Sequence, residues 1–228
     1  MSAKDQKLDN PVWYSLTETH QDVAIVYDDV KFYQPDYCPF GGSAAVNNTP
    51  KSLSQYSKLA TNFYVVGHKP HFTEDLELSK ELVCNQMILD APVSVEIKEE
   101  IVVLQLHHKD ELFRLVNLVQ PGYFRKKTSQ LGRYYGIFQN QELVAVSGER
   151  MKMCSYTEVS AVVTHPNHVK KGFAKQLVAH TANQIFRENK MPYLHVAETN
   201  IGAISMYEKL GFKTRRKISF WNLVLTQQ

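Results

Sequence analysis

The region from residue 156 to residue 212 constrains this chain most, because strand-like and helix-like patterns alternate there in a fixed order. Residues 158–164 are rich in β-branched side chains and end at a His-Pro pair, which is typical of a strand that stops there. A helical repeat of apolar residues starts at Gly172. A second strand pattern covers residues 193–197, and a short helix follows from Asn200. This order predicts a mixed sheet with a parallel strand pair, connected by the long helix.

The turn before the long helix is suited to an anion. It reads Val169-Lys170-Lys171-Gly172-Phe173-Ala174. The first N–H groups of a helix lack intrahelical partners and carry partial positive charge, so phosphates bind there. Gly172 lets the backbone come close to a ligand, and Ala174 is too small to block it. Alone, so short a basic pattern is more often a solvated helix start than a phosphate-binding turn. The second half of the region favours the phosphate-binding turn.

The second half carries the spacing Asn-x-x-Ala-x-x-x-Tyr-x-x-x-Gly-Phe, at Asn200, Ala203, Tyr207, Gly211 and Phe212. Asn200 is a suitable N-cap and Gly211 a suitable residue just past the helix end. Tyr207 lies on the apolar face of this helix, where it could also be a core residue with a locally satisfied hydroxyl.

At these two motifs the chain resembles the GNAT superfamily of acyl-CoA-dependent N-acetyltransferases. The phosphate turn of that family is Gln/Arg-x-x-Gly-x-Gly/Ala, and Val169 stands where Gln or Arg is preferred. This departure should weaken cofactor binding by ~1 kcal/mol, which Lys170 and Lys171 could offset. The resemblance covers residues 95–228, and residues 157–166 are closest to a two-domain branch that resembles glycine N-acyltransferases.

The resemblance implies a fold and a domain organisation. It implies an α/β protein of the α+β type with a mixed sheet, in which residues 93–228 form a GNAT N-acetyltransferase domain. Residues 1–92 would form a smaller α/β domain that could be a degenerate GNAT-like fold. Asp90-Ala91-Pro92 is the expected boundary.

The resemblance also implies a site for acetyl-CoA. No metal site is expected, because the sequence has no helix-face His pair with a carboxylate partner. It implies that cofactor contacts come from Val162, Val163, Thr164, Val169, Lys170, Lys171, Gly172, Phe173, Ala174, Asn200, Ala203 and Tyr207. Glu158 would be the general base, directly or through water, and Tyr207 the acid that protonates the departing thiolate. Glu158 could instead be a solvated strand-end carboxylate, and Asn200 only an N-cap. His195 could pack in the core or face the substrate.

The function implied is acetyl transfer from acetyl-CoA, or another short acyl-CoA, to a primary amine. The transfer would be direct, in a ternary complex. Small amines and amino acids are favoured as acceptors, and peptide amino termini stay open. The alternative is a non-catalytic acyl-CoA-binding regulatory protein.

Composition restricts the other classes. A net charge of +3 over 228 residues, with only short basic runs, does not favour a nucleic-acid partner. No apolar run approaches the ~20 residues of a membrane span. Residues 1–10 lack the apolar core of a signal peptide.

Three isolated cysteines, Cys38, Cys84 and Cys154, indicate buried thiols in a reducing compartment, so we expect a cytoplasmic protein. The oligomeric state stays open.

The remaining elements follow from local patterns. We expect a helix over 12–20, an irregular connection over 34–50, a strand over 62–66, a helix followed by a strand within 76–89, a strand over 101–106, a helix over 110–119, a short helix over 125–132, a hairpin of 133–139 and 142–150 across Asn140-Gln141, and a final strand over 213–225.

Overall fold

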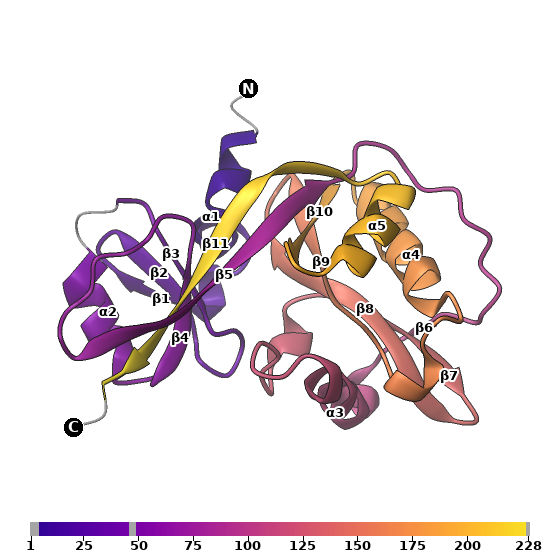
Figure 1. The fold of residues 1–228 in the computed structure, drawn as a ribbon, viewed down its shortest axis with the longest axis horizontal. Coiled ribbons are helices and arrows are strands. Elements are labelled where there is room, and N and C mark those ends of the chain that lie inside the picture. The colour runs from indigo at the N-terminus through magenta and orange to yellow at the C-terminus, as the bar shows by residue number, and fades with distance from the viewer. Residues whose placement is uncertain (1–4, 46–48, 227–228) are drawn as a thin grey trace.

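The computed structural model of the protein describes residues 5–45 and 49–226. They form a mixed sheet with the strand order β1-β2-β3-β4-β11-β5-β10-β9-β8-β7-β6 (Figure 1). The strands are β1 (Ala24–Tyr27), β2 (Val30–Tyr33), β3 (Phe40–Ser43), β4 (Asn62–Val66), β5 (Leu76–Ile88), β6 (Val102–Val103), β7 (Tyr134–Gln139), β8 (Glu142–Lys152), β9 (Tyr156–Thr164), β10 (Met191–Ala197) and β11 (Lys213–Leu225). The α-helices are α1 (Pro11–Glu18), α2 (Thr49–Ser57), α3 (Lys109–Val119), α4 (Phe173–Arg187) and α5 (Ile201–Lys209). Short 3-10 helices cover Asp5–Asp9, Gln21–Val23, Leu106–His108, Thr128–Gln130 and Pro166–His168.

The long strands β5 and β11 connect two lobes. They run as a diagonal antiparallel pair between the lobe of β1–β4 and the lobe of β6–β10 (Figure 1). The last part of β11, from Phe220 to Val224, also pairs with β4. The C-terminal strand therefore completes the sheet of the N-terminal lobe, and one sheet runs through both lobes. The division near residue 92 stays a prediction.

The two faces of the sheet in the second lobe carry different helices. Neighbouring residues of a strand point to opposite faces. Tyr134 packs in a buried cluster with Leu115 of α3, whereas Tyr135 packs with Phe173 and Leu177 of α4. Helices α3 and α4 therefore cover opposite faces of β7, β8 and β9.

The elements around the predicted site are confirmed. β9, α4, β10, α5 and β11 occur in the expected order, and β10 runs parallel to β9. The β7–β8 hairpin turns at Asn140 and Gln141, whose φ angles are 52° and 68°. Positive φ at both central residues matches the twist of the flanking strands, as a two-residue hairpin requires.

Other expectations were wrong. Residues 76–88 form one continuous strand, not a helix followed by a strand. β5 pairs with β10 on one side and with β11 on the other, so sheet pairing overrides the helical pattern of its first residues. The connection over 34–50 contains β3 and the start of α2, and residues 46–48 lie outside the described residues. Only Val102–Val103 of the expected strand over 101–106 is a strand, and residues 128–130 of the expected helix over 125–132 form a 3-10 turn.

Within residues 5–45 and 49–226, no helix has the length and apolarity to cross a membrane. The same residues hold no group of three or more His, Cys, Asp or Glu side chains that could bind a metal. Cys38 and Cys84 are buried free thiols, as expected, but Cys154 is exposed.

Candidate active site

The site begins where β9 and β10 separate. β10 pairs with β9 only over three residues, where Tyr193 opposite Glu158 is the last pair. Beyond it, β10 continues along β5 as far as Ala197, while β9 continues along β8. One edge of β9 beyond Glu158 therefore faces a gap, where no strand of the described part of the chain pairs with it, and its backbone groups are available to a ligand.

A β-bulge in β9 lies at this gap. The pairing with β8 shifts between Ser160 and Val163, and Ala161 has φ of 51°. Two residues of β9 thus oppose Ser147 alone. A bulge bends its strand and redirects its backbone and side chains. Side chains of a regular strand alternate between the two faces of the sheet, and the bulge breaks this alternation in β9.

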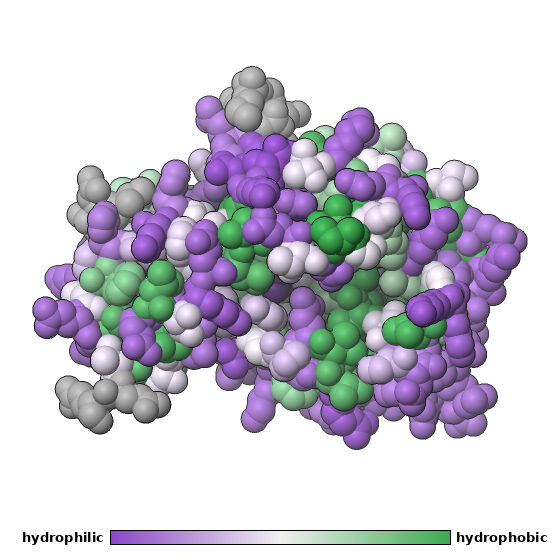
Figure 2. All heavy atoms as spheres, viewed as in Figure 1, coloured by the Kyte–Doolittle hydropathy of each residue, from purple (hydrophilic) through white to green (hydrophobic). Residues whose placement is uncertain are grey.

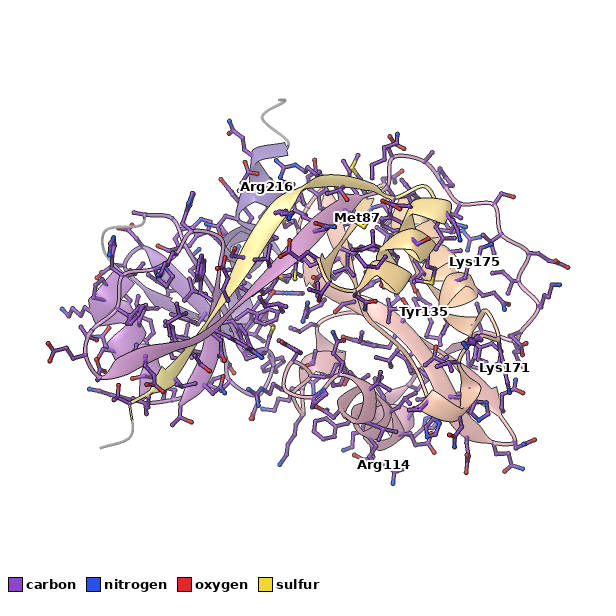
Figure 3. The ribbon with its side chains drawn as sticks, in the orientation of Figure 1. Met87, Arg114, Tyr135, Lys171, Lys175 and Arg216 are labelled. Atoms are coloured by element: carbon purple, nitrogen blue, oxygen red, sulfur yellow. The ribbon has the colours of Figure 1, made fainter. Side chains whose placement is uncertain are left out.

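The start of α4 lies at one end of the gap. Gly172 is the N-cap, with φ of 78°, and no side chain of residues 5–45 or 49–226 caps the helix. Lys170 also has positive φ, of 64°. The amides of Phe173, Ala174 and Lys175 donate to no acceptor among the described residues. A Cβ on Gly172 would meet nothing within 4 Å, so the space in front of these donors is open. Lys171 and Lys175 project from this end of α4 (Figure 3).

Helix α5 supplies the opposite wall. The Asn200 side chain accepts a hydrogen bond from the Ala203 amide at 3.1 Å, which confirms that Asn200 is the N-cap. Tyr207 is 6% exposed, and its hydroxyl has no hydrogen-bond partner among the described residues. Burial raises the pKa of Tyr207, so its phenol stays protonated at neutral pH.

These elements enclose a cavity of about 540 Å³. Its walls include the bulged part of β9, the end of β10, the first turn of α4, helix α5, and residues from the N-terminal lobe and β11. On the face shown in Figure 2, hydrophobic groups gather near the centre, between the diagonal of β5 and β11 and the second lobe. A cavity of this size can hold the reactive end of a cofactor together with a small acceptor.

A buried ion pair forms part of the cavity wall. Nε of Arg150 donates to Oε2 of Glu158 at 2.8 Å, and Nη2 donates to Oε1 at 3.0 Å. The side chain of Arg150 is 12% exposed and that of Glu158 only 1%. The guanidinium also lies 4.7 Å from the ring centroid of Phe40. Parallel bonds of this kind fix the orientation of both groups.

His195 holds the other side of Glu158. Its Nδ1 lies 2.8 Å from Oε1 of Glu158, and its Nε2 lies 3.1 Å from Nε2 of Gln86. Arg215 donates to the oxygen of the Gln86 side chain, so the Gln86 amide nitrogen faces His195. The arrangement therefore fits a neutral His195 that donates from Nδ1 and accepts at Nε2.

The carboxylate of Glu158 consequently has no hydrogen-bond acceptor site left free. Its two oxygens accept from Arg150, His195 and, at 3.5 Å, from the Met151 amide. Burial would raise the pKa of Glu158, but the charge of Arg150 and the hydrogen bonds from His195 and Arg150 lower it to about 2. It is not the solvated strand-end carboxylate that was the alternative interpretation. As it lies here, it has neither a free lone pair nor the basicity of a general base.

The structure brings together only part of the predicted site. The cavity is lined by Glu158, Val162, Val163, Ala174, Asn200, Ala203 and Tyr207. Thr164, Val169, Lys170, Lys171, Gly172 and Phe173 do not line it and lie along or beside the turn that leads into α4. The Phe173 side chain is buried against Tyr135 and Leu177, which leaves only its backbone for a cofactor.

Sequence reasoning missed the N-terminal and β8 contributions to the cavity. Arg150 was placed only at the end of a hairpin, and Phe40 in an irregular connection. Both line the cavity, as do Leu82 of β5 and Phe220 of β11. An arginine eight residues before a strand glutamate in a hairpin could have suggested a cross-strand pair. Nothing local indicated that Phe40 approaches it.

Comparisons with known proteins agree with the fold. A family model described as "FR47-like protein" matches residues 134–221, which span β7 to most of β11. The structure of a GNAT-family protein from Novosphingobium aromaticivorans DSM 12444 aligns with a TM-score of 0.87 and 28% identity, over 96% of this chain and 99% of that chain. The chain is therefore similar to GNAT-family proteins over nearly its whole length. Its mixed α/β fold is the fold of GNAT acetyltransferase structures.

Two more distant structures share this fold. A GCN5-related N-acetyltransferase from Kribbella flavida aligns with a TM-score of 0.65 and 13% identity, over 100% of this chain and 97% of that one. A GCN5-related N-acetyltransferase-like protein from Streptococcus suis 89/1591 aligns with a TM-score of 0.63 and 12% identity, over 98% and 97%. A search of curated proteins found no match. The likeness in fold to these structures covers nearly the whole chain.

Proposed function

We propose that this GNAT protein transfers an acetyl group from acetyl-CoA to a primary amine. The observation that carries the proposal is the gap between β9 and β10, which opens into a cavity containing the unpartnered hydroxyl of Tyr207. A pantetheine arm in this gap could bond to the free edge of β9. The pyrophosphate would then reach the open amides of Phe173, Ala174 and Lys175.

The proposed reaction is a direct transfer in a ternary complex. The amine enters as the free base, and its nitrogen attacks the thioester carbon. A β9 amide at the bulge would stabilise the oxyanion. The carbon–sulfur bond then breaks, and Tyr207 gives its proton to the leaving thiolate. The extra proton on the new amide nitrogen leaves to solvent, and solvent returns a proton to Tyr207, so the products are the acetamide and free CoA.

Glu158 has a positioning role in this proposal. Since its lone pairs are occupied, it could accept a proton from the amine only if the acceptor displaced Arg150 or His195. The geometry favours a carboxylate that fixes Arg150 and His195 around the acceptor, and solvent that takes the amine proton before binding.

An amine-panel assay with acetyl-CoA tests the proposal. We expect release of free thiol that depends on the amine, together with a product heavier than the amine by one acetyl group. The control is acetyl-CoA without amine, which measures hydrolysis. Binding of CoA without transfer to any amine would instead support the non-catalytic acyl-CoA-binding alternative. That alternative is consistent with a Glu158 that cannot act as a general base.

A further inference from the structure

Arg150 keeps an open edge towards the cavity. A guanidinium has five N–H donors in a planar fork. Nε and one N–H of Nη2 donate to Glu158 along the side of the fork. The end of the fork, formed by Nη1 and the other N–H of Nη2, donates to none of the described residues. Since Arg150 lines the cavity, these donors are available to a bound molecule.

The surroundings select what can bind there. Among the described residues that line the cavity, Arg150 is the only lysine or arginine. Phe40, Leu82 and Phe220 provide apolar surface around it. Buried donors on a charged group are costly when unsatisfied, so a ligand that supplies acceptors gains affinity. A carboxylate matches the two parallel donors of a guanidinium better than a single carbonyl oxygen does.

We propose that the open edge of Arg150 binds a carboxylate of the acceptor, which makes the acceptor an amino acid with an apolar side chain. This inference rests on the proposed acetyl transfer. Arg150 then orients the acceptor by its carboxylate, while Phe40, Leu82 and Phe220 contact its side chain. Glu158 and His195 keep the guanidinium in place, which explains why these groups are buried together in the cavity wall.

Matched acceptor pairs provide the first test. L-Phenylalanine is compared with phenethylamine, and L-leucine with 3-methylbutylamine. For each compound the pH is chosen so that the same fraction of the amine is present as the free base. We expect kcat/KM to be about 10- to 100-fold higher for the amino acid in each pair, because the amine without a carboxylate lacks the charge-assisted hydrogen bonds to Arg150. Equal values within the pairs would overturn the role of Arg150 and leave acetyl transfer intact.

A binding measurement keeps the two proposals separate. In the presence of CoA, N-acetyl-L-phenylalanine should bind at least 10-fold more tightly than N-acetylphenethylamine, as measured by calorimetry. This readout needs no turnover. If neither amine series is acetylated but the difference in binding persists, the transferase function fails and the carboxylate site stands. If the two compounds bind equally, the carboxylate site fails.

Variants assign the effect to Arg150. The double variant Arg150→Met/Glu158→Gln removes both buried charges, so neither is left unpaired. It should keep thermal protection by CoA and lose the preference for N-acetyl-L-phenylalanine. Arg114→Met is the matched control, since Arg114 is exposed on α3 and does not line the cavity (Figure 3). A double variant that is protected by CoA and still prefers the carboxylate would overturn the inference.

Discussion

The guanidinium of Arg150 and the carboxylate of Glu158 form two parallel hydrogen bonds, at 2.8 and 3.0 Å, across the β8–β9 hairpin. The pair brings one positive and one negative charge into the cavity wall at no net charge. Its geometry is fixed further by His195 and by the ring of Phe40. A site built this way orients a substrate with groups that are already in position, so little reorganisation is needed on binding.

The first prediction concerns stability as a function of pH. The pKa of Glu158 in the folded protein is about 2, below its ordinary value of 4.5. Its ionised form therefore stabilises the fold fully above about pH 4.5, and this contribution is lost as the pH falls towards 2. We expect the free energy of unfolding to drop by on the order of 2 kcal/mol more in the wild type than in Arg150→Met/Glu158→Gln between pH 7 and pH 3. Chemical denaturation at pH 7, 4.5 and 3 measures the difference, and parallel losses would contradict the prediction.

The second prediction concerns the rising limb of the pH–rate profile. Glu158 does not titrate near neutral pH, so it should not set that limb. If the amine must enter as the free base, the limb in kcat/KM should follow the pKa of the acceptor amine. Two acceptors that differ by about 2 pKa units should give limbs displaced by about the same amount. A limb at one fixed pH for both acceptors would indicate a base on the enzyme.

The sequence was informative where local chemistry decides the structure. The N-cap at Asn200, the hairpin turn at Asn140 and the start of α4 at Gly172 each depend on residues close in the chain. The saturation of Glu158 does not, because its partners come from different strands. Arg150 lies on β8, His195 on β10, and the ring of Phe40 in the other lobe. Likewise, residues 76–88 become a strand because β10 and β11 flank them, which no local pattern records.

The third prediction concerns Tyr207. Its unpartnered hydroxyl lines the cavity and is protonated at neutral pH, so Tyr207→Phe removes a proton donor without leaving a former partner unpaired. We expect kcat to fall by about 10²-fold, in the range typical of a general acid, and the dissociation constant of CoA to change less than threefold. Tyr135→Phe is the matched control, since Tyr135 on β7, labelled in Figure 3, is also buried but does not line the cavity. An equal loss of CoA affinity and turnover would contradict the acid role.

The fourth prediction concerns the turn before α4, where Gly172 has φ of 78° and open space in front of it. Gly172→Glu adds backbone strain of about 1 kcal/mol and places a negative charge where the pyrophosphate is expected. We expect thermal protection by CoA to disappear. Gly122→Glu is a control with matched strain, because Gly122 has φ of 95° and also meets nothing within 4 Å, but lies in the turn after α3. Both variants should lose similar stability without ligand, and only Gly172→Glu should lose the CoA-dependent rise in Tm. Retained protection in Gly172→Glu would mean that the pyrophosphate binds elsewhere.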